Sequence, residues 1–314
     1  MMPQDDHWLH DDAPRTFGQA LGAYLNFRRA EKSPKTRLKH DWLAGVLRPL
    51  WNIPLDDVQP QALMRLLRQR EGKAQRETAH RAARFAVAIF QFATGEGWTK
   101  NSLMLTWKPT LEPLRAVSHP AITDELQFGK LMLLVDQRGY SQDTVYNALR
   151  LLPRVALRPG ELRNARWSDV NRDKAELIIP IERMKMRRSH LVPLSRQALE
   201  ILEEQWAVSG HQEYIFPGVR PRRPMSDAAM NMALRGMFIT SDAHVPHGFR
   251  VAFSTILNER DPSNGPLVEL QLSHRKGDKV ASIYDRSERV PDRHKLMQTW
   301  GDIIEELKAK ARVK

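Results

Sequence analysis

The second half of the chain contains, in order, an arginine, a lysine, a His-x-x-Arg pair, a histidine and a tyrosine. These residues are Arg158, Lys185, His247, Arg250, His274 and Tyr284. Arginine forks can bind the non-bridging oxygens of a phosphate and neutralise its charge. A phenol with a pKa of about 10 needs a base or nearby cations before it attacks at neutral pH. A histidine can move a proton, and a lysine can protonate a departing oxygen. The ordered set therefore predicts phosphodiester chemistry.

Two pairs in this set have helical spacing. Arg158 and Glu161 are three residues apart, next to a proline that suits the first turn of a helix. His247 and Arg250 are also three apart, at the expected N-terminus of a helix, where an anion is stabilised. The alternatives are a surface salt bridge for the first pair, and a capping histidine with a solvated arginine for the second.

Three further residues have weaker local signals. Lys185 lies among other cations between two short β-type runs, and such a turn is usually just solvated. His274 follows an apolar run, where a histidine is more often a structural cap. Tyr284, one of five tyrosines, lies among several Lys and Arg residues.

Periodicity predicts mostly helices in two domains, since 314 residues exceed what one core usually serves. We expect an acidic tail (1–15), a helical domain (16–110), a proline-containing linker (111–121) and a second domain (122–314). Helices are expected at 16–32, 33–51, 60–71, 74–97, 123–137, 143–170 with interruptions near Pro153 and Pro159, 195–208, 225–238, 247–260, 266–274 and 292–310. Two β-type runs, 175–182 and 190–194, predict a hairpin with a basic tip.

Composition narrows the class of protein. The net charge of +12 favours a polyanionic partner, with nucleic acid the first candidate. The lack of cysteine excludes disulfides, thiol catalysis and cysteine-bound metals. No apolar run is long enough to cross a membrane, and the acidic N-terminus lacks the apolar region of a secretory signal. We expect a cytoplasmic protein.

In combination the motifs resemble tyrosine recombinases, the phage integrase family, and within it the satellite-phage and genomic-island branch. The resemblance rests on "ALRPGELRNARWSDV", "ERMKMRRSHLVPLS", "HGFRVAFSTIL", "LSHRKGDKVASIYDRS", "KLMQTWGDII" and "RETAHRAARFAVAIFQFATGEGW", and it covers the chain from about Thr16 onward. It implies a mainly α fold with a small antiparallel β element: an N-terminal helical core-binding (SAM-like) bundle followed by a catalytic domain.

The resemblance also implies roles for phosphate-binding residues. Arg158 and Arg250 match the two phosphate-binding arginines of the family. His274 matches a position that hydrogen-bonds the phosphate. Glu161 matches an acidic residue that steadies the active-site arginine and histidine.

The proton-transfer and nucleophile roles are implied in the same way. Tyr284 matches the nucleophile, which forms a 3′-phosphotyrosine. Lys185 matches the general acid on the leaving 5′-hydroxyl, and His247 the histidine that assists proton transfer and contacts phosphate. This chemistry conserves the bond energy, so no cofactor, ATP or metal is expected.

The implied partner is double-stranded DNA with attachment sites, bound by a homo-tetramer of chains that are monomers when free. Accessory DNA-bending or excision factors are possible partners, and no membrane is expected. DNA-contact candidates in the first domain are Lys35, Arg37, Lys39, Arg76, Thr78, Arg81 and Arg84. For each of them an ordinary solvated side chain is the alternative.

Departures from the family pattern leave alternatives open. Ala156-Leu157 stand where many relatives have Thr-Gly. An arm-binding domain is either absent or belongs to a longer parent chain. The apolar face of 292–310 packs on its own domain or docks on a neighbouring protomer. Rival functions are type IB topoisomerase-like DNA relaxation and a non-catalytic DNA-binding regulator with the same fold.

Overall fold

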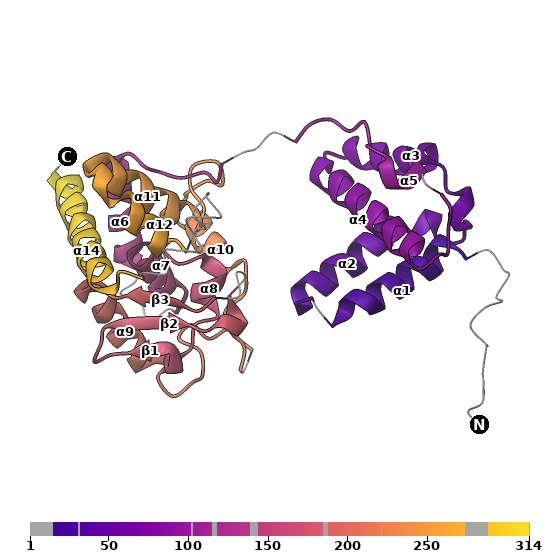
Figure 1. Cartoon of the computed structure of the whole chain (residues 1–314). Coiled ribbons are helices and arrows are strands. Elements are labelled where there is room, and N and C mark those ends of the chain that lie inside the picture. Colours follow the sequence, from indigo (N-terminus) through magenta and orange to yellow (C-terminus); the bar gives the residue numbers. More distant parts are fainter. Residues whose placement is uncertain are drawn as a thin grey trace, which may run out of the picture. The chain divides into compact units, whose positions relative to one another are not determined.

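The structure is a computed structural model that describes residues 15–30, 32–101, 103–114, 118–138, 144–184, 188–220, 222–273 and 288–313. The chain forms two compact units, Met1–Val117 and Ser118–Lys314 (Figure 1). Each unit has a separate apolar core. The expected linker, 111–121, spans the boundary between them.

The described part of the N-terminal unit is helical. Its helices are α1 (Phe17–Arg29), α2 (Pro34–Val46), α3 (Pro60–Glu71), α4 (Arg76–Gly95) and the short α5 (Leu103–Thr106). A capping box formed by Thr16 and Gln19 begins α1. Gly97, with φ of 73°, follows the end of α4 in the left-handed region, where glycine is favoured.

The second helix is shorter than the sequence predicts. We expected a helix over 33–51, but α2 ends at Val46 and a 3₁₀ turn, Arg48–Leu50, follows. Pro49 explains the difference, because it has no N–H to donate to the carbonyl four residues earlier and its ring crowds that carbonyl. The expected start is confirmed, since Ser33 caps α2 and Pro34 is its first residue.

The C-terminal unit combines helices with a three-stranded antiparallel sheet, so the predicted mainly α fold with a small β element is confirmed. The helices are α6 (Glu125–Arg138), α7 (Thr144–Val155), α8 (Pro159–Arg163), α9 (Arg196–Ser209), α10 (Ala229–Gly236), α11 (Gly248–Arg260), α12 (Gly265–Gln271) and α14 (Val290–Val313). The strands are β1 (Val170–Asn171), β2 (Glu176–Ile179) and β3 (His190–Pro193), in the order β1-β2-β3. The expected hairpin is the β2–β3 pair.

Helix α7 is central to this unit, because every residue from Asn147 to Val155 is buried. The interruption expected near Pro153 and Pro159 lies between them, because α7 continues to Val155 and α8 begins at Pro159. Pro153 itself lies inside α7, where it removes one helical hydrogen bond. The carbonyl oxygen of Pro153 accepts a hydrogen bond from Nε1 of Trp300 at 2.8 Å. The helical expectation for 164–170 is wrong, since this stretch leads through a turn into β1.

The long helix α14 lies along α6 (Figure 1) and packs on its own unit. Its six apolar residues, Leu296, Met297, Trp300, Ile303, Ile304 and Leu307, are all buried. Trp300 lies between Phe128 and Phe253, with ring centroids 5.8 and 5.4 Å away. Own-domain packing is thus confirmed. Docking of this apolar face on a neighbouring protomer would require these buried side chains to leave the core of their own unit.

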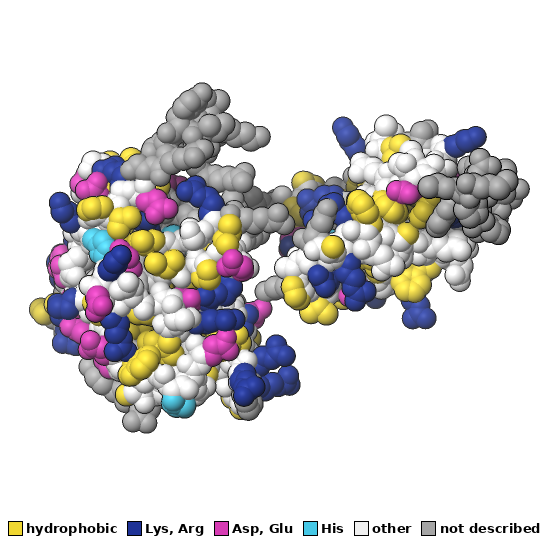
Figure 2. Space-filling view, turned by 60° about the horizontal axis from the view of Figure 1, so that its bottom comes forward, with side chains coloured by type: hydrophobic (Ala, Val, Ile, Leu, Met, Phe, Trp, Pro, Cys, Tyr) yellow, Lys and Arg dark blue, Asp and Glu magenta, His cyan; other side chains and the backbone are white. Residues whose placement is uncertain are grey.

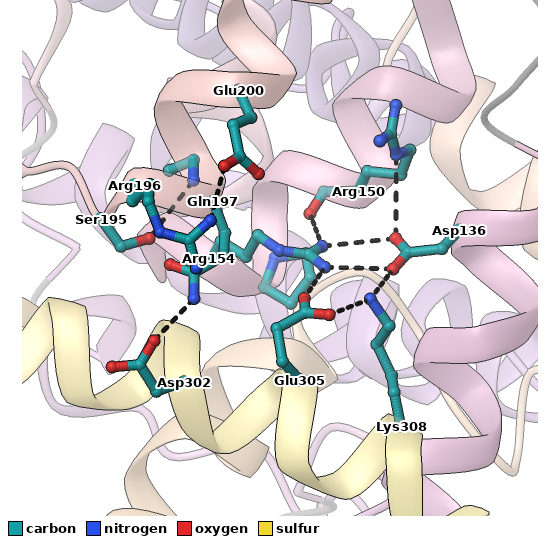
Figure 3. A network of polar contacts seen from close by, with 12 residues as sticks. Asp136, Arg150, Arg154, Ser195, Arg196, Gln197, Glu200, Asp302, Glu305 and Lys308 are labelled. Carbon is teal, nitrogen blue, oxygen red and sulfur yellow. Dashed lines mark hydrogen bonds and ion pairs between the residues drawn. The ribbon is translucent and has the colours of Figure 1, made fainter. Parts of the chain in front are cut away.

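A polar network joins α14 to α6 and α7 (Figure 3). The buried guanidinium of Arg154 donates to Asp136 at 3.1 Å and to Glu305 at 2.9 Å. The ammonium of Lys308 lies 2.5 Å from a carboxylate oxygen of each of the same two acids. Burial alone would raise the pKa of Asp136, but Arg154 and Lys308 hold this pKa below its usual value. The paired charges fix the register of the three helices.

A substitution at Gly129 tests the close approach of α6 and α14. A Cβ added there would lie 2.3 Å from the carbonyl oxygen of Leu307. We expect Gly129→Ala to destabilise the C-terminal unit by about 1–3 kcal/mol, because α14 would have to shift. Gly236→Ala is the control, since its Cβ would meet no atom within 4 Å. Urea unfolding followed by fluorescence measures both, and equal stabilities would contradict this packing.

Candidate active site

Two arginines far apart in the sequence are held by neighbouring carbonyl oxygens at the end of α12, and one of them also by the end of α7. Arg250, buried on α11, donates Nη1 to the carbonyl oxygen of Ala156 and Nη2 to that of Leu272, the latter at 2.7 Å. Arg158, just before α8, donates Nη2 to the carbonyl oxygen of Ser273 at 3.5 Å. The ends of α7 and α12 therefore position both guanidinium groups.

The backbone at these two helix ends has an uncommon conformation. Ala156 has φ of 51° and Ser273 has φ of 49°, the left-handed region that non-glycine residues rarely adopt. Each such residue costs about 1–2 kcal/mol. Both residues direct a carbonyl oxygen to a guanidinium, Ala156 to Arg250 and Ser273 to Arg158. Strain at functional positions is a common pattern.

Glu161 holds Arg158 at two points. One carboxylate oxygen accepts from Nη1 of Arg158 at 2.8 Å, and the other accepts from its backbone N–H at 3.1 Å. The Glu161 side chain is buried, whereas that of Arg158 is 26% exposed. This contact follows from the three-residue spacing. It fixes the direction of the Arg158 side chain while leaving part of it accessible.

Arg250 is buried and has charges of both signs around it. Burial, and then the nearby Arg158, lower the pKa of Arg250 to about 10, although Glu161 and Glu269 oppose this. Arg250 is still a cation at neutral pH, so keeping it charged there costs about 3 kcal/mol. An anion bound between Arg158 and Arg250 would remove this cost. The arrangement therefore favours an anionic ligand.

Sequence reasoning missed a histidine beside these cations. His190 on β3 is buried, and within the described residues neither ring nitrogen makes a hydrogen bond of normal geometry. Burial, and then Arg293, Arg250 and Arg158, lower the pKa of His190 to about 3; the Gln271 backbone opposes this only weakly. The ring is therefore neutral at physiological pH. Its place in a short apolar strand gave no sign of this environment.

A buried glutamine and arginine were also missed. Arg293 on α14 donates to Oε1 of Gln271 at 2.8 Å and to the carbonyl oxygen of Leu191. Nε2 of Gln271 donates to the carbonyl oxygen of Val155 at 3.1 Å. These contacts join α14, β3, α12 and α7 directly behind the carbonyls that hold Arg250. The first turn of α14 thus supports the arginine site.

The remaining catalytic candidates are only partly described. His247 precedes α11, and its side chain does not cap that helix by a hydrogen bond. Its ring centroid lies 4.3 Å from that of His119. Lys185, His274 and Tyr284 lie outside the described residues.

Among described residues, no group of three or more His, Asp or Glu could hold a metal ion. No described helix is long and apolar enough to span a membrane.

The DNA-contact candidates of the N-terminal unit differ in their surroundings. Arg76 pairs with Glu112 at 2.5 Å, and Arg81 pairs with Glu77. Lys39 and Arg84 are exposed, Arg37 donates to the carbonyl oxygen of Lys32, and Thr78 is half-buried. The side chain of Lys35 lies outside the described residues. On the face shown in Figure 2 this unit presents few acidic side chains, whereas the C-terminal unit presents many.

His190 predicts a pH dependence of stability. Below about pH 6.5 the unfolded chain protonates this histidine, but the folded protein does not until about pH 3. Unfolding therefore takes up a proton, and the free energy of unfolding falls as pH falls through this window. Between pH 6.5 and pH 5 the free energy of unfolding should fall by about 1–2 kcal/mol less in His190→Leu than in the wild type. Urea titrations measure it, with exposed His211→Leu as the control. An unchanged slope in His190→Leu would contradict the buried neutral ring.

Sequence comparisons match both units. The phage integrase family matches residues 124–289, and the phage integrase central domain matches residues 17–110. Prophage integrase IntZ of Escherichia coli K12 is 34% identical over 255 residues, covering 81% of this chain and 61% of that protein. The integrase of Enterobacteria phage P4 is 30% identical over 258 residues, covering 77% and 58%. The chain thus spans about 60% of the length of these two relatives.

Solved structures share the fold. A lambda integrase tetramer bound to a Holliday junction has a TM-score of 0.68 at 16% identity, covering 89% of this chain and 83% of that one. A lambda integrase dimer bound to a COC′ core site has a TM-score of 0.66 at 18% identity, covering 87% and 96%. The family match spans more than half of the sequence, in the unit that holds Arg158 and Arg250. The chain therefore belongs to the phage integrase family of tyrosine recombinases.

Proposed function

We propose that this chain is the strand-cleaving and strand-joining part of a site-specific DNA recombinase that integrates or excises a mobile element. The observation that carries the proposal is the pair Arg158 and Arg250, two guanidinium groups held by main-chain carbonyls, of which Arg250 is buried and feels the charge of Arg158. A DNA phosphate supplies one negative charge and two non-bridging oxygens, which two guanidinium forks can bind.

In the proposed first step the phenol oxygen of Tyr284 attacks the scissile phosphorus. Its proton passes toward His247, and a 3′-phosphotyrosine bond forms as the bond to the 5′-oxygen breaks. Lys185 protonates that oxygen, while His274 donates a hydrogen bond to the phosphate. Arg158 and Arg250 neutralise the charge that would repel the nucleophile.

The second step reverses the first with a different strand. A 5′-hydroxyl from the partner DNA attacks the phosphotyrosine, a new phosphodiester forms, and the tyrosine is released. One bond is exchanged for a similar one at each step, so no external energy source is needed. Joining a partner strand gives recombination, whereas rejoining the original strand would give only relaxation.

The proposed partner is duplex DNA carrying attachment sites, bound by four copies of the chain. Support comes from the lambda integrase structures, which are a dimer on a core site and a tetramer on a Holliday junction. The basic net charge of +12 fits a polyanion. We place Lys39 and Arg84 of the N-terminal unit among the phosphate contacts, since both are exposed without an ion pair among the described residues.

A covalent adduct tests the chemistry. Nicked suicide duplexes with a randomised segment are incubated with the protein, and the trapped strands are sequenced to define a substrate. On it we expect a protein–DNA adduct that Tyr284→Phe abolishes. Arg158→Ala and Arg250→Ala should slow adduct formation by about 100-fold or more, because each removes a fixed charge at the phosphate.

The matched control is Arg196→Ala, which removes a surface arginine paired with Glu200 on α9. It should cleave at the wild-type rate. An adduct that persists in Tyr284→Phe would refute the nucleophile. If the wild type binds DNA but forms no adduct, the chain is a non-catalytic DNA-binding protein. Adducts that yield only relaxed plasmid would point to a topoisomerase.

Salt dependence tests the DNA-contact residues. Removal of one phosphate-binding side chain should reduce the slope of log affinity against log salt concentration by about 1. We expect this for Lys39→Ala and Arg84→Ala in titrations of duplex DNA. Arg76→Ala is the comparison and should change the slope less, because Glu112 already pairs with Arg76. Equal slopes in all variants would place the DNA contacts elsewhere.

A further inference from the structure

The first residues of the C-terminal unit are hydrogen-bonded to the segment just before α11. The backbone N–H of Val245 donates to the carbonyl oxygen of Pro120 at 3.2 Å. The backbone N–H of Ile122 donates to Nδ1 of His244 at 3.0 Å. The segment 119–122 is therefore tied at two points to the segment that leads into His247.

The second of these bonds requires a neutral histidine, since Nδ1 of His244 must accept. His244 is buried, and burial, followed by Arg235, lowers its pKa to about 4. The ring also packs on Phe249 of α11, with centroids 4.4 Å apart. At physiological pH the bond to Ile122 therefore persists, and this tie is a fixed part of the fold.

The tie leaves no room at the first residue of α11. A Cβ added to Gly248 would lie 2.6 Å from the carbonyl oxygen of Pro120 and 3.1 Å from Cα of Ala121. Glycine at 248 thus permits the segment 119–122 to lie directly against the helix start. This close approach brings the neighbouring His119 to the helix start as well.

His119 is exposed, yet its ring lies on that of His247. The centroids are 4.3 Å apart and the rings are inclined by 49°. His247 itself makes no capping hydrogen bond to α11. A ring contact at this distance restricts rotation of the imidazole about its side-chain bonds, and aromatic pairs contribute beyond their buried area.

We propose that His119 is a positioning residue, which holds the imidazole of His247 in the orientation from which it meets the nucleophile's proton and the phosphate. This role rests on the proposed function of His247. His119 lies 128 positions before its partner in the sequence and acts through that partner.

A double-mutant cycle tests this role, because coupled residues give non-additive effects. Single-turnover adduct formation is measured on the selected suicide duplex, together with the affinity for uncleaved duplex. We expect His119→Ala to slow cleavage by about 3- to 10-fold at unchanged affinity. His119→Phe, which keeps a ring, should recover most of the rate. In a His247→Ala background, His119→Ala should change the rate by less than about twofold.

Exposed His211→Ala is the matched control and should leave the rate unchanged. If His119→Ala slows cleavage further in the His247→Ala background and also weakens duplex affinity, His119 is a DNA contact and the proposal is overturned. An unchanged rate in His119→Ala would also overturn it. Urea unfolding shows whether His119→Ala has a folding defect. If it has one, the cleavage rate of His119→Phe, which keeps a ring, tests the proposal instead.

A second readout does not depend on the proposed function. In DNA-free protein, the ring resonances of His247 should shift in His119→Ala more than in His211→Ala, because the neighbouring ring is removed. Unshifted resonances would contradict the contact itself. If the wild type forms no adduct on any duplex, the proposed function fails while this contact can still be tested.

Discussion

The central constraint in the C-terminal unit is that two guanidinium groups, those of Arg158 and Arg250, lie near each other and that Arg250 is buried. Arg158 lowers the pKa of Arg250, which shows that the two cations repel each other. Main-chain carbonyls of Ala156, Leu272 and Ser273 hold them in place. Such carbonyls orient a cation without cancelling its charge. The two guanidinium groups are therefore held in place with their charge intact, as an anion-binding site requires.

The rest of the unit keeps these carbonyls where they are. Gln271 bridges the ends of α12 and α7, and Arg293 of α14 holds Gln271. Farther along α14, Trp300 packs in the core and Glu305 joins the network with Arg154. Helix α14 thus supports the backbone that holds the two arginines.

Local spacing predicted much of this, and long-range contacts account for what it missed. The contact between Arg158 and Glu161 follows from two residues one helical turn apart. Gln271 and Arg293 look ordinary in the sequence, since their roles arise only when four elements meet. The prolines indicated the break between α7 and α8 only to within a few residues, since Pro153 is still inside α7. Residue types and order therefore indicated the chemistry, whereas the supporting contacts required the fold.

The most direct test replaces the scissile phosphate in the suicide duplex by a methylphosphonate, which lacks the negative charge. If Arg250 acts by neutralising that charge, Arg250→Ala, slow on the phosphodiester, should cleave the methylphosphonate within about tenfold of the wild-type rate. If the variant stays as slow on the neutral substrate, while the wild type cleaves it, the account of the two arginines is contradicted.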